Sequence, residues 1–209
     1  MKRLSILLVA VLLLTSVAFT SAFADDAVTG NAPLKGQLPL LITNAGQGPE
    51  GKEVRLLVSQ AGALTSAQYM YDAEPGHANS AISPNMNTAL RNYKTLFVVI
   101  GSSAKGLGAS GITIDDEIRR LNAMMTEAKR LNMQIIAIHI GGREARSSSA
   151  TNANERSINA IAPHANGFIV LKDGNYDGRF TTLARNVNAP LTIIDTKFDL
   201  MSVVQTMYK

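Results

Sequence analysis

Hydrophobic and polar positions alternate along the chain in blocks, with short apolar runs followed by segments of helical periodicity. The apolar runs are strand candidates: Leu38–Thr43, Ala67–Asp72, Leu96–Ile100, Gln134–Ile140, Phe168–Leu171 and Leu191–Asp195. Most of these runs are apolar almost throughout, which is typical of strands covered on both faces of a sheet. Ala67–Asp72 alternates more, so we expect it at an edge of the sheet.

The segments between the runs carry apolar residues at helical spacing. The predicted helices are Glu50–Ala61, Pro84–Tyr93, Ile114–Leu131, Asn152–Ile161, Phe180–Val187 and Lys197–Met207. Ser83 is an expected N-cap, and Thr113 with Asp116 forms an expected capping pair. Six strands interleaved with six helices predict a single three-layer α/β domain over residues 38–209, with a doubly wound, mainly parallel sheet. We expect a Rossmann-like, flavodoxin-like strand order, 2-1-3-4-5, with the sixth strand at an edge.

The first 24 residues have the parts of a secretory signal peptide. Lys2 and Arg3 precede an apolar stretch, and Ala22-Phe23-Ala24 precedes two aspartates. We expect cleavage after this triplet, a flexible leader over residues 25–37, and an exported protein, periplasmic or secreted, with no stable membrane insertion afterwards. A retained membrane anchor is the alternative, since the apolar stretch with its flanks is nearly long enough to span a bilayer.

Composition narrows the class of protein. The chain has no cysteine, which excludes disulfides, thiol nucleophiles and thiolate metal sites. Removing Lys2 and Arg3 with the signal peptide leaves 18 of the 20 basic residues against 16 acidic ones, a net charge of +2. Such a balanced charge with few aromatic residues does not match a nucleic-acid-binding surface, so we expect no nucleic-acid partner.

Five of the apolar runs end in short polar turns, most of them rich in glycine. In a parallel sheet these turns converge on the carboxyl edge, where open α/β sheets bind ligands. Three of the turns supply the predicted ligand-binding residues: Thr43, Asn44, Gln47, Ser102, Ser103, Lys105, His139 and Arg143. Lys105 is consistent with two roles: a cationic contact for an anionic ligand, or a loop lysine exposed to solvent. The leading hypothesis is an exported module that binds a small anionic solute, without a resident cofactor.

The turn after Gln134–Ile140 has two open interpretations. Arg143 and Arg146, three residues apart, fit either a bidentate clamp for a carboxylate or phosphate, or surface pairs with Glu144 and Glu155. His139 fits a packed, hydrogen-bonded strand end as well as a catalyst, because no acidic partner is evident beside it.

Two short motifs in the turn after Leu96–Ile100 have weak support. Gly106–Gly111 spells GxGxxG, but five residues separate it from the strand and an acidic helix start follows, so we expect no dinucleotide. Ser102-Ser-Ala-Lys105 spells SxxK, yet the glycines at 101, 106 and 108 predict a loop rather than the helix that this motif needs. The enzyme alternative is a hydrolase or isomerase using His139 with Ser102 or Ser103.

The segment Asp173-Gly-Asn-Tyr-Asp-Gly178 matches the opening half of a calcium loop, with Asp173, Asn175 and Asp177 as candidate ligands. The twelfth position, where a bidentate glutamate belongs, is Ala184, and such residues also form ordinary tight turns. The third hypothesis is therefore a non-enzymatic structural or interaction domain, steadied by calcium in this loop.

Four segments taken together resemble the pattern of an uncharacterised family of exported bacterial domains. They are Pro39–Gln47, Gly101–Ile112, Ile138–Arg143 and Asp173–Gly178, and the resemblance spans residues 38–200. It implies a single exported α/β domain and supplies no activity.

Overall fold

The computed structural model describes residues 34–62, 67–69 and 83–209. Its strands are β1 (Leu40–Ala45), β2 (Gln68–Tyr69), β3 (Thr95–Ile100), β4 (Gln134–His139), β5 (Gly167–Leu171) and β6 (Leu191–Ile194). Its helices are α2 (Glu50–Gln60), α3 (Pro84–Asn92), α4 (Ala104–Ala109), α5 (Ile114–Arg130), α6 (Ala153–Ile161), α7 (Arg179–Asn186) and α8 (Asp199–Met207). Short 3-10 turns are η1 (Arg143–Ala145), η2 (Ala162–His164) and η3 (Lys172–Asn175). Within these described ranges, no helix is long and apolar enough to cross a membrane.

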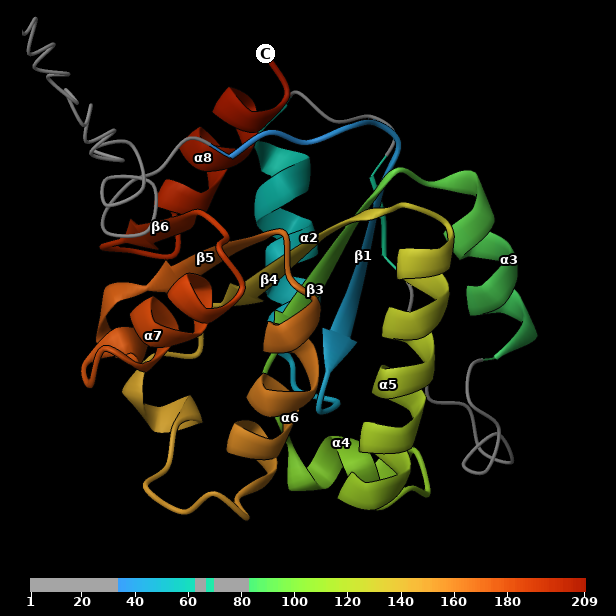
Figure 1. Ribbon diagram of the computed structural model, residues 1–209, viewed down its shortest axis with the longest axis vertical. Coiled ribbons are helices and arrows are strands. Elements are labelled where there is room, and N and C mark those ends of the chain that lie inside the picture. The colour runs from blue at the N-terminus through green and yellow to red at the C-terminus, as the bar shows by residue number, and fades with distance from the viewer. Residues whose placement is uncertain (1–33, 63–66, 70–82) are drawn as a thin grey trace, which may run out of the picture.

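The six strands form one parallel sheet in the order β2-β1-β3-β4-β5-β6 (Figure 1). The α/β class and the predicted strand order are therefore confirmed, with β6 at the edge beside β5. The strand order reverses between β1 and β3, where Asn44 pairs with Val99 and Ala45 with Ile100. Ligands of open α/β sheets bind at such a topological switch point.

Helices cover both faces of the sheet, which makes the three predicted layers. On one face, α2 and α8 pack against alternate strand residues such as Ile42 (Figure 1). On the opposite face lie α3, α5, α6 and α7. We name these the α2/α8 face and the α5/α6 face. Because successive strand residues point to opposite faces, Asn44 shares the α2/α8 face with Ile42, whereas Thr43 points to the α5/α6 face.

Capping side chains begin two helices where the sequence predicts. The Ser83 hydroxyl accepts a hydrogen bond from the N–H of Met86 at 3.1 Å, at the start of α3. Thr113 and Asp116 form a capping box at α5, whose first turn also carries two further acidic residues. Negative charge there is favourable because the amino end of a helix is the positive end of its dipole.

Helix α4 contradicts the sequence analysis, which predicts a loop because of the glycines in Ala104–Ala109. Ser103 caps this helix by accepting from the N–H of Gly106 at 3.1 Å, and Leu107 is buried. A Cβ atom on Gly106 would lie 2.0 Å from the carbonyl oxygen of Gln47. Gly106 therefore permits close packing against Gln47. The Ser103 cap and this packing outweigh the low helix propensity of glycine, which costs about 1 kcal/mol.

The packed part of the chain includes residues that precede the predicted domain start at residue 38. Leu34 is buried and occupies the space that a side chain on Gly167 would need. The backbone of Gln37 donates to and accepts from the Thr95 hydroxyl. The predicted signal peptide and the leader up to residue 33 lie outside the described residues, as do residues 70–72 of the predicted second strand.

Candidate functional site

Backbone hydrogen bonds join the turns after β1 and β3 at the switch point. The N–H of Gly48 donates to the carbonyl oxygen of Gly101 at 2.9 Å, and Ser103 donates to Gly46 at 3.0 Å. Gln47 and Ser102 also form an isolated antiparallel bridge. Gly46 and Gln47 have φ angles of 98° and 60°, and the glycine at the first position accepts this conformation without strain. The two turns therefore form one connected unit at the carboxyl edge.

The Glu50 carboxyl group lies over the glycines of three different turns. A Cβ atom on Gly48 would be 2.2 Å from Glu50 Oε2, one on Gly101 would be 2.3 Å from it, and one on Gly141 would be 3.2 Å from Oε1. We name Gly48, Gly101 and Gly141 the glycine cradle. The glycine-rich turns of the sequence thus make room for a side chain of the protein itself.

Burial raises the pKa of the Glu50 carboxyl group above its ordinary value, although Lys197 lowers it in part. Its Oε2 atom is buried without a hydrogen-bond partner in the protein. Such a carboxyl group at a switch point is the kind of residue that marks functional sites. Sequence analysis missed Glu50. The available signal was an acid directly after Gly48-Pro49, at the start of the helix that follows β1.

Three further polar side chains at this edge have buried atoms without a partner in the protein. They are Asn44, through both Nδ2 and Oδ1, Gln47 through Oε1 and Ser102 through Oγ. Asn44 is 1% exposed and Gln47 is 2% exposed. We name Asn44, Gln47, Glu50 and Ser102 the switch-point site. Because buried polar atoms are almost always hydrogen-bonded, this concentration of unpartnered atoms requires an explanation.

A buried ion pair on the α5/α6 face holds the turn after β1. Glu117 accepts from the N–H of Gly46 at 2.8 Å and from Nε2 of Gln47 at 2.9 Å, and Arg120 donates to both carboxylate oxygens. Arg120 also donates to the carbonyl oxygen of Asn44 at 3.1 Å. Burial alone would raise the pKa of Glu117, but Arg120 and these donors hold it below its usual value. The pair therefore orients Gln47 and stays ionised.

Thr43, Ser103 and Lys105, also predicted as ligand-binding residues, lie apart from the switch-point site. Thr43 is buried and points to the α5/α6 face. The Ser103 hydroxyl caps α4, and Lys105 is an exposed residue of that helix. Lys105 is therefore exposed as its structural alternative expects, but on a helix rather than a loop, and ligand contacts of Thr43, Ser103 and Lys105 stay predictions.

His139 is a packed strand-end residue, 1% exposed. Its ring stacks on Phe180 at a centroid distance of 5.0 Å, with Nδ1 3.2 Å from the carbonyl oxygen of Ile100 and Nε2 3.3 Å from that of Gly142. Burial lowers the pKa of His139, so the neutral ring is favoured. Both ring nitrogens face main-chain carbonyls rather than a serine hydroxyl.

Arg143 and Arg146, which follow β4, lie in different environments. Arg143 is exposed, and its guanidinium lies 4.0 Å from the ring centre of Tyr176 and near Asp173, with 3.6 Å between Nε and Oδ1. Arg146 is buried instead, and it pairs with Glu155 at 2.8 Å and with Asp177 at 2.8 Å. The expected surface pair between Arg146 and Glu155 is therefore a core pair, because α6 and η3 fold over it.

The side chains of the predicted calcium loop face donors of the protein. Asp173 accepts from the N–H of Arg143 at 3.0 Å, and Asn175 Oδ1 accepts from the N–H of Phe180 at 2.8 Å, at the start of α7. Asp177 accepts from Arg146. In the part of the chain that the structure describes, no group of three or more histidine, cysteine, aspartate or glutamate residues could hold a metal ion. The calcium hypothesis stays a prediction.

Comparison with known proteins identifies the family. Neither the curated proteins nor the solved structures contain a match to this chain. A family model described as a domain of unknown function (DUF6305) matches residues 37–208, which cover every strand of the sheet. The chain belongs to the DUF6305 family, a family of domains of unknown function.

Proposed function

We propose that this domain binds a small, neutral, hydroxyl-rich solute at the switch-point site. The observation that carries the proposal is the group of buried side-chain atoms without a partner in the protein, contributed by Asn44, Gln47, Glu50 and Ser102. Leaving such a group unpaired costs about 1–3 kcal/mol, so a ligand that bonds these atoms gains from each of them.

The chemistry of these atoms selects the class of solute. Gln47 Oε1 and Asn44 Oδ1 accept hydrogen bonds, Asn44 Nδ2 donates, and the Ser102 hydroxyl does either. A sugar or polyol hydroxyl both donates and accepts, so it matches such a mixed set. An anion lacks donors for the amide oxygens and meets the Glu50 carboxyl group. The anionic solute expected from the sequence is therefore the competing hypothesis in the test. Its cationic contacts would be the exposed Lys105 and Arg143.

Access to the site requires a side chain to move. Asn44 and Gln47 are almost fully covered, whereas Glu50 is half-buried on the α2/α8 face that Asn44 shares. Oε2 of Glu50 has no hydrogen-bond partner in the protein, and the backbone hydrogen bond to its carboxyl group comes from Glu50 itself. We propose that Glu50 rotates out of the glycine cradle when the solute enters.

A thermal-shift screen of the purified protein tests the proposal. The panel contains neutral sugars and polyols, with uronates, sugar phosphates and amino sugars of matched size. We expect stabilisation by neutral members, weakened in Ser102→Ala and retained in Lys105→Ala with Arg143→Ala. If anionic members stabilise the protein, and this stabilisation is lost in the Lys105→Ala, Arg143→Ala double variant, the neutral solute is rejected in favour of the anionic one. No stabilisation by any member would reject small-molecule binding at this edge.

Catalysis is a second candidate function, favoured by the raised pKa of Glu50. A carboxyl group of this kind suits general acid–base chemistry, as in a hydrolase or isomerase. Turnover of a solute identified by the screen should then be lost in Glu50→Gln and kept in His139→Gln. Loss in His139→Gln alone would instead support the pairing of His139 with Ser102 or Ser103.

Export of the protein is also part of the proposal, on the pattern of its first 24 residues. Mass spectrometry of the protein from the periplasm or medium should give a mature chain that begins at Asp25. A chain that keeps Met1 in the membrane fraction would support the retained anchor.

A further inference from the structure

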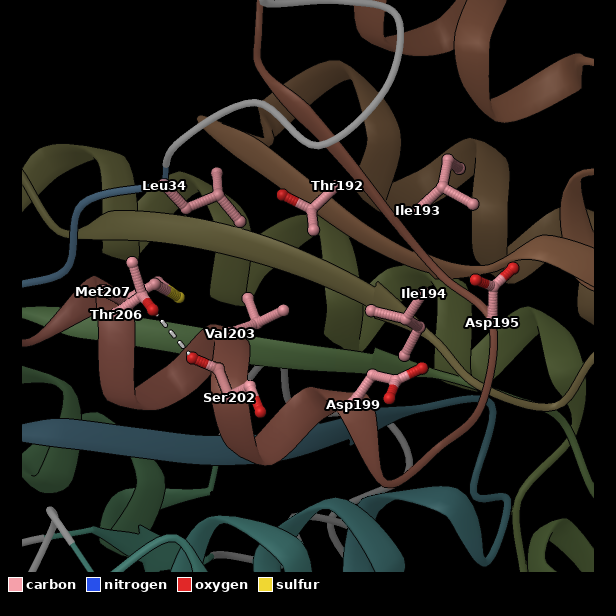
Figure 2. Close-up of a pocket in the computed structure, with 10 residues that line it drawn as sticks. All are labelled: Leu34, Thr192, Ile193, Ile194, Asp195, Asp199, Ser202, Val203, Thr206 and Met207. Atoms are coloured by element: carbon pink, nitrogen blue, oxygen red, sulfur yellow. Dashed lines mark hydrogen bonds between the residues drawn. The ribbon is translucent and has the colours of Figure 1, made fainter.

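A groove runs between the edge strand β6 and helix α8, and its volume of about 460 Å³ is within the range of small-molecule sites (Figure 2). Figure 2 shows Asp195 and Asp199 together at one end of the groove and Leu34 with Met207 at the other. We name it the β6–α8 groove. None of the switch-point residues lines it.

The groove changes in character along its length. Its middle and far end are more apolar, formed by Ile194 of β6, Val203 and Met207 of α8, and Leu34, with three hydroxyl side chains among them, Thr192, Ser202 and Thr206. The near end carries the two carboxylates, from the turn after β6 and the first turn of α8. Asp199 and Met207 are eight residues apart on one helix, which corresponds to a length of about 12 Å.

The carboxylate end carries two aspartates against one lysine at ion-pair distance, which leaves a net charge of −1 among these described residues. Asp195 faces Lys172 at 3.2 Å, but both side chains are about three-quarters exposed, so water screens this pair. Asp199 accepts from the N–H of Thr196 at 2.8 Å, a neutral donor. Lys197, the nearest lysine in the sequence, instead pairs with Glu53 at 2.9 Å.

We propose that the β6–α8 groove binds an amphipathic cation, with an ammonium head at Asp195 and Asp199 and an aliphatic chain along Ile194 and Val203. The charge at one end selects a cation over a fatty acid, and the apolar length beyond it selects an alkyl chain over a compact ion. An added peptide strand is not favoured, because Leu191 and Thr192 of β6 are 0% and 5% exposed and leave little open backbone. This proposal is independent of the switch-point site.

Isothermal titration calorimetry with three probes of equal chain length tests the proposal. The probes are octylammonium, octanol and octanoate, each below its micelle concentration. We expect octylammonium to bind about tenfold more tightly than the other two, and added salt to weaken it. Asp195→Asn with Asp199→Asn should weaken octylammonium about tenfold and leave octanol unchanged. Val203→Gln should weaken both probes, and Asp115→Asn, an exposed acid of α5, is the matched control.

Three outcomes would overturn the proposal. They are equal binding of octanoate and octylammonium, octylammonium binding that survives the double aspartate change, and no binding of octylammonium at all. If the double variant fails to fold by circular dichroism, Asp195→Asn alone with the salt series decides, because this exposed side chain supports no described backbone contact. If the affinity for octylammonium then changes neither in Asp195→Asn nor with added salt, the cation proposal is rejected.

Discussion

Replacing Gly101 with alanine tests whether the Glu50 carboxyl group lies in the glycine cradle. Gly101 does not have a left-handed φ angle, so its backbone accepts alanine without strain. The added Cβ atom would lie 2.3 Å from Glu50 Oε2 and 2.5 Å from Cδ. Both distances are far below van der Waals contact, so the carboxyl group must leave the cradle or the turns must move apart.

Two opposing effects set the size of the change in stability. Overpacking of a filled site costs about 1–3 kcal/mol. Replacing glycine with alanine also restricts the unfolded chain, which stabilises the protein by about 0.4–1 kcal/mol. We expect Gly101→Ala to lower the free energy of unfolding by about 1–2 kcal/mol. In a Glu50→Ala background the carboxyl group is gone, and the same change should be neutral or stabilising.

A double-mutant cycle measures this coupling. The wild type, Gly101→Ala, Glu50→Ala and the double variant are unfolded in urea at pH 7 and followed by circular dichroism. Gly108→Ala is the matched control, because a Cβ atom there meets nothing within 4 Å and its φ angle is not left-handed. If the changes in unfolding free energy of the two single variants sum to that of the double variant within about 0.5 kcal/mol, the two positions are not coupled and the glycine cradle is refuted.

Five further predictions concern stability. Glu117→Gln should lower the free energy of unfolding by about 3 kcal/mol in the same urea assay, because Arg120 is left buried without its counter-charge. A loss below about 1 kcal/mol would contradict this reasoning. The raised pKa of Glu50 means that the folded state holds its proton longer than the unfolded chain, so stability should fall as pH rises above 4.5. Glu50→Gln should flatten this pH profile, and parallel profiles would reject the assignment. Burial lowers the pKa of His139, so the unfolded chain binds a proton first and stability should also fall as pH drops below 6.5. His139→Gln should reduce that acid loss in pH-dependent melting. Asn175→Ala should lower the free energy of unfolding by about 1 kcal/mol, because the N–H groups of Phe180 and Thr181 in the first turn of α7 lose their acceptor. A melting temperature that does not differ between calcium and chelator would remove the calcium hypothesis.

Most of the fold follows from local patterns. The apolar runs and helical spacings predict six strands and six of the seven described helices, and right-handed crossovers then restrict the strand order to few choices. Capping residues such as Ser83 and Thr113 mark helix starts because each bonds a backbone N–H within three residues. Helix α4 escaped prediction because its stabilising contact, between Gly106 and Gln47, joins distant parts of the chain.

The site was less predictable than the fold. The sequence alone determined the alternation of elements and the edge at which the turns converge, since both depend on residue spacing and strand handedness. Only the tertiary structure decided what meets at that edge. Arg146, expected on the surface, is buried against Glu155 of a later helix, and His139, a packed strand end or a catalyst by sequence, stacks on Phe180 of another. Glu50 became the central residue of the site because glycines from three separate turns converge on its carboxyl group, a meeting that no local pattern encodes.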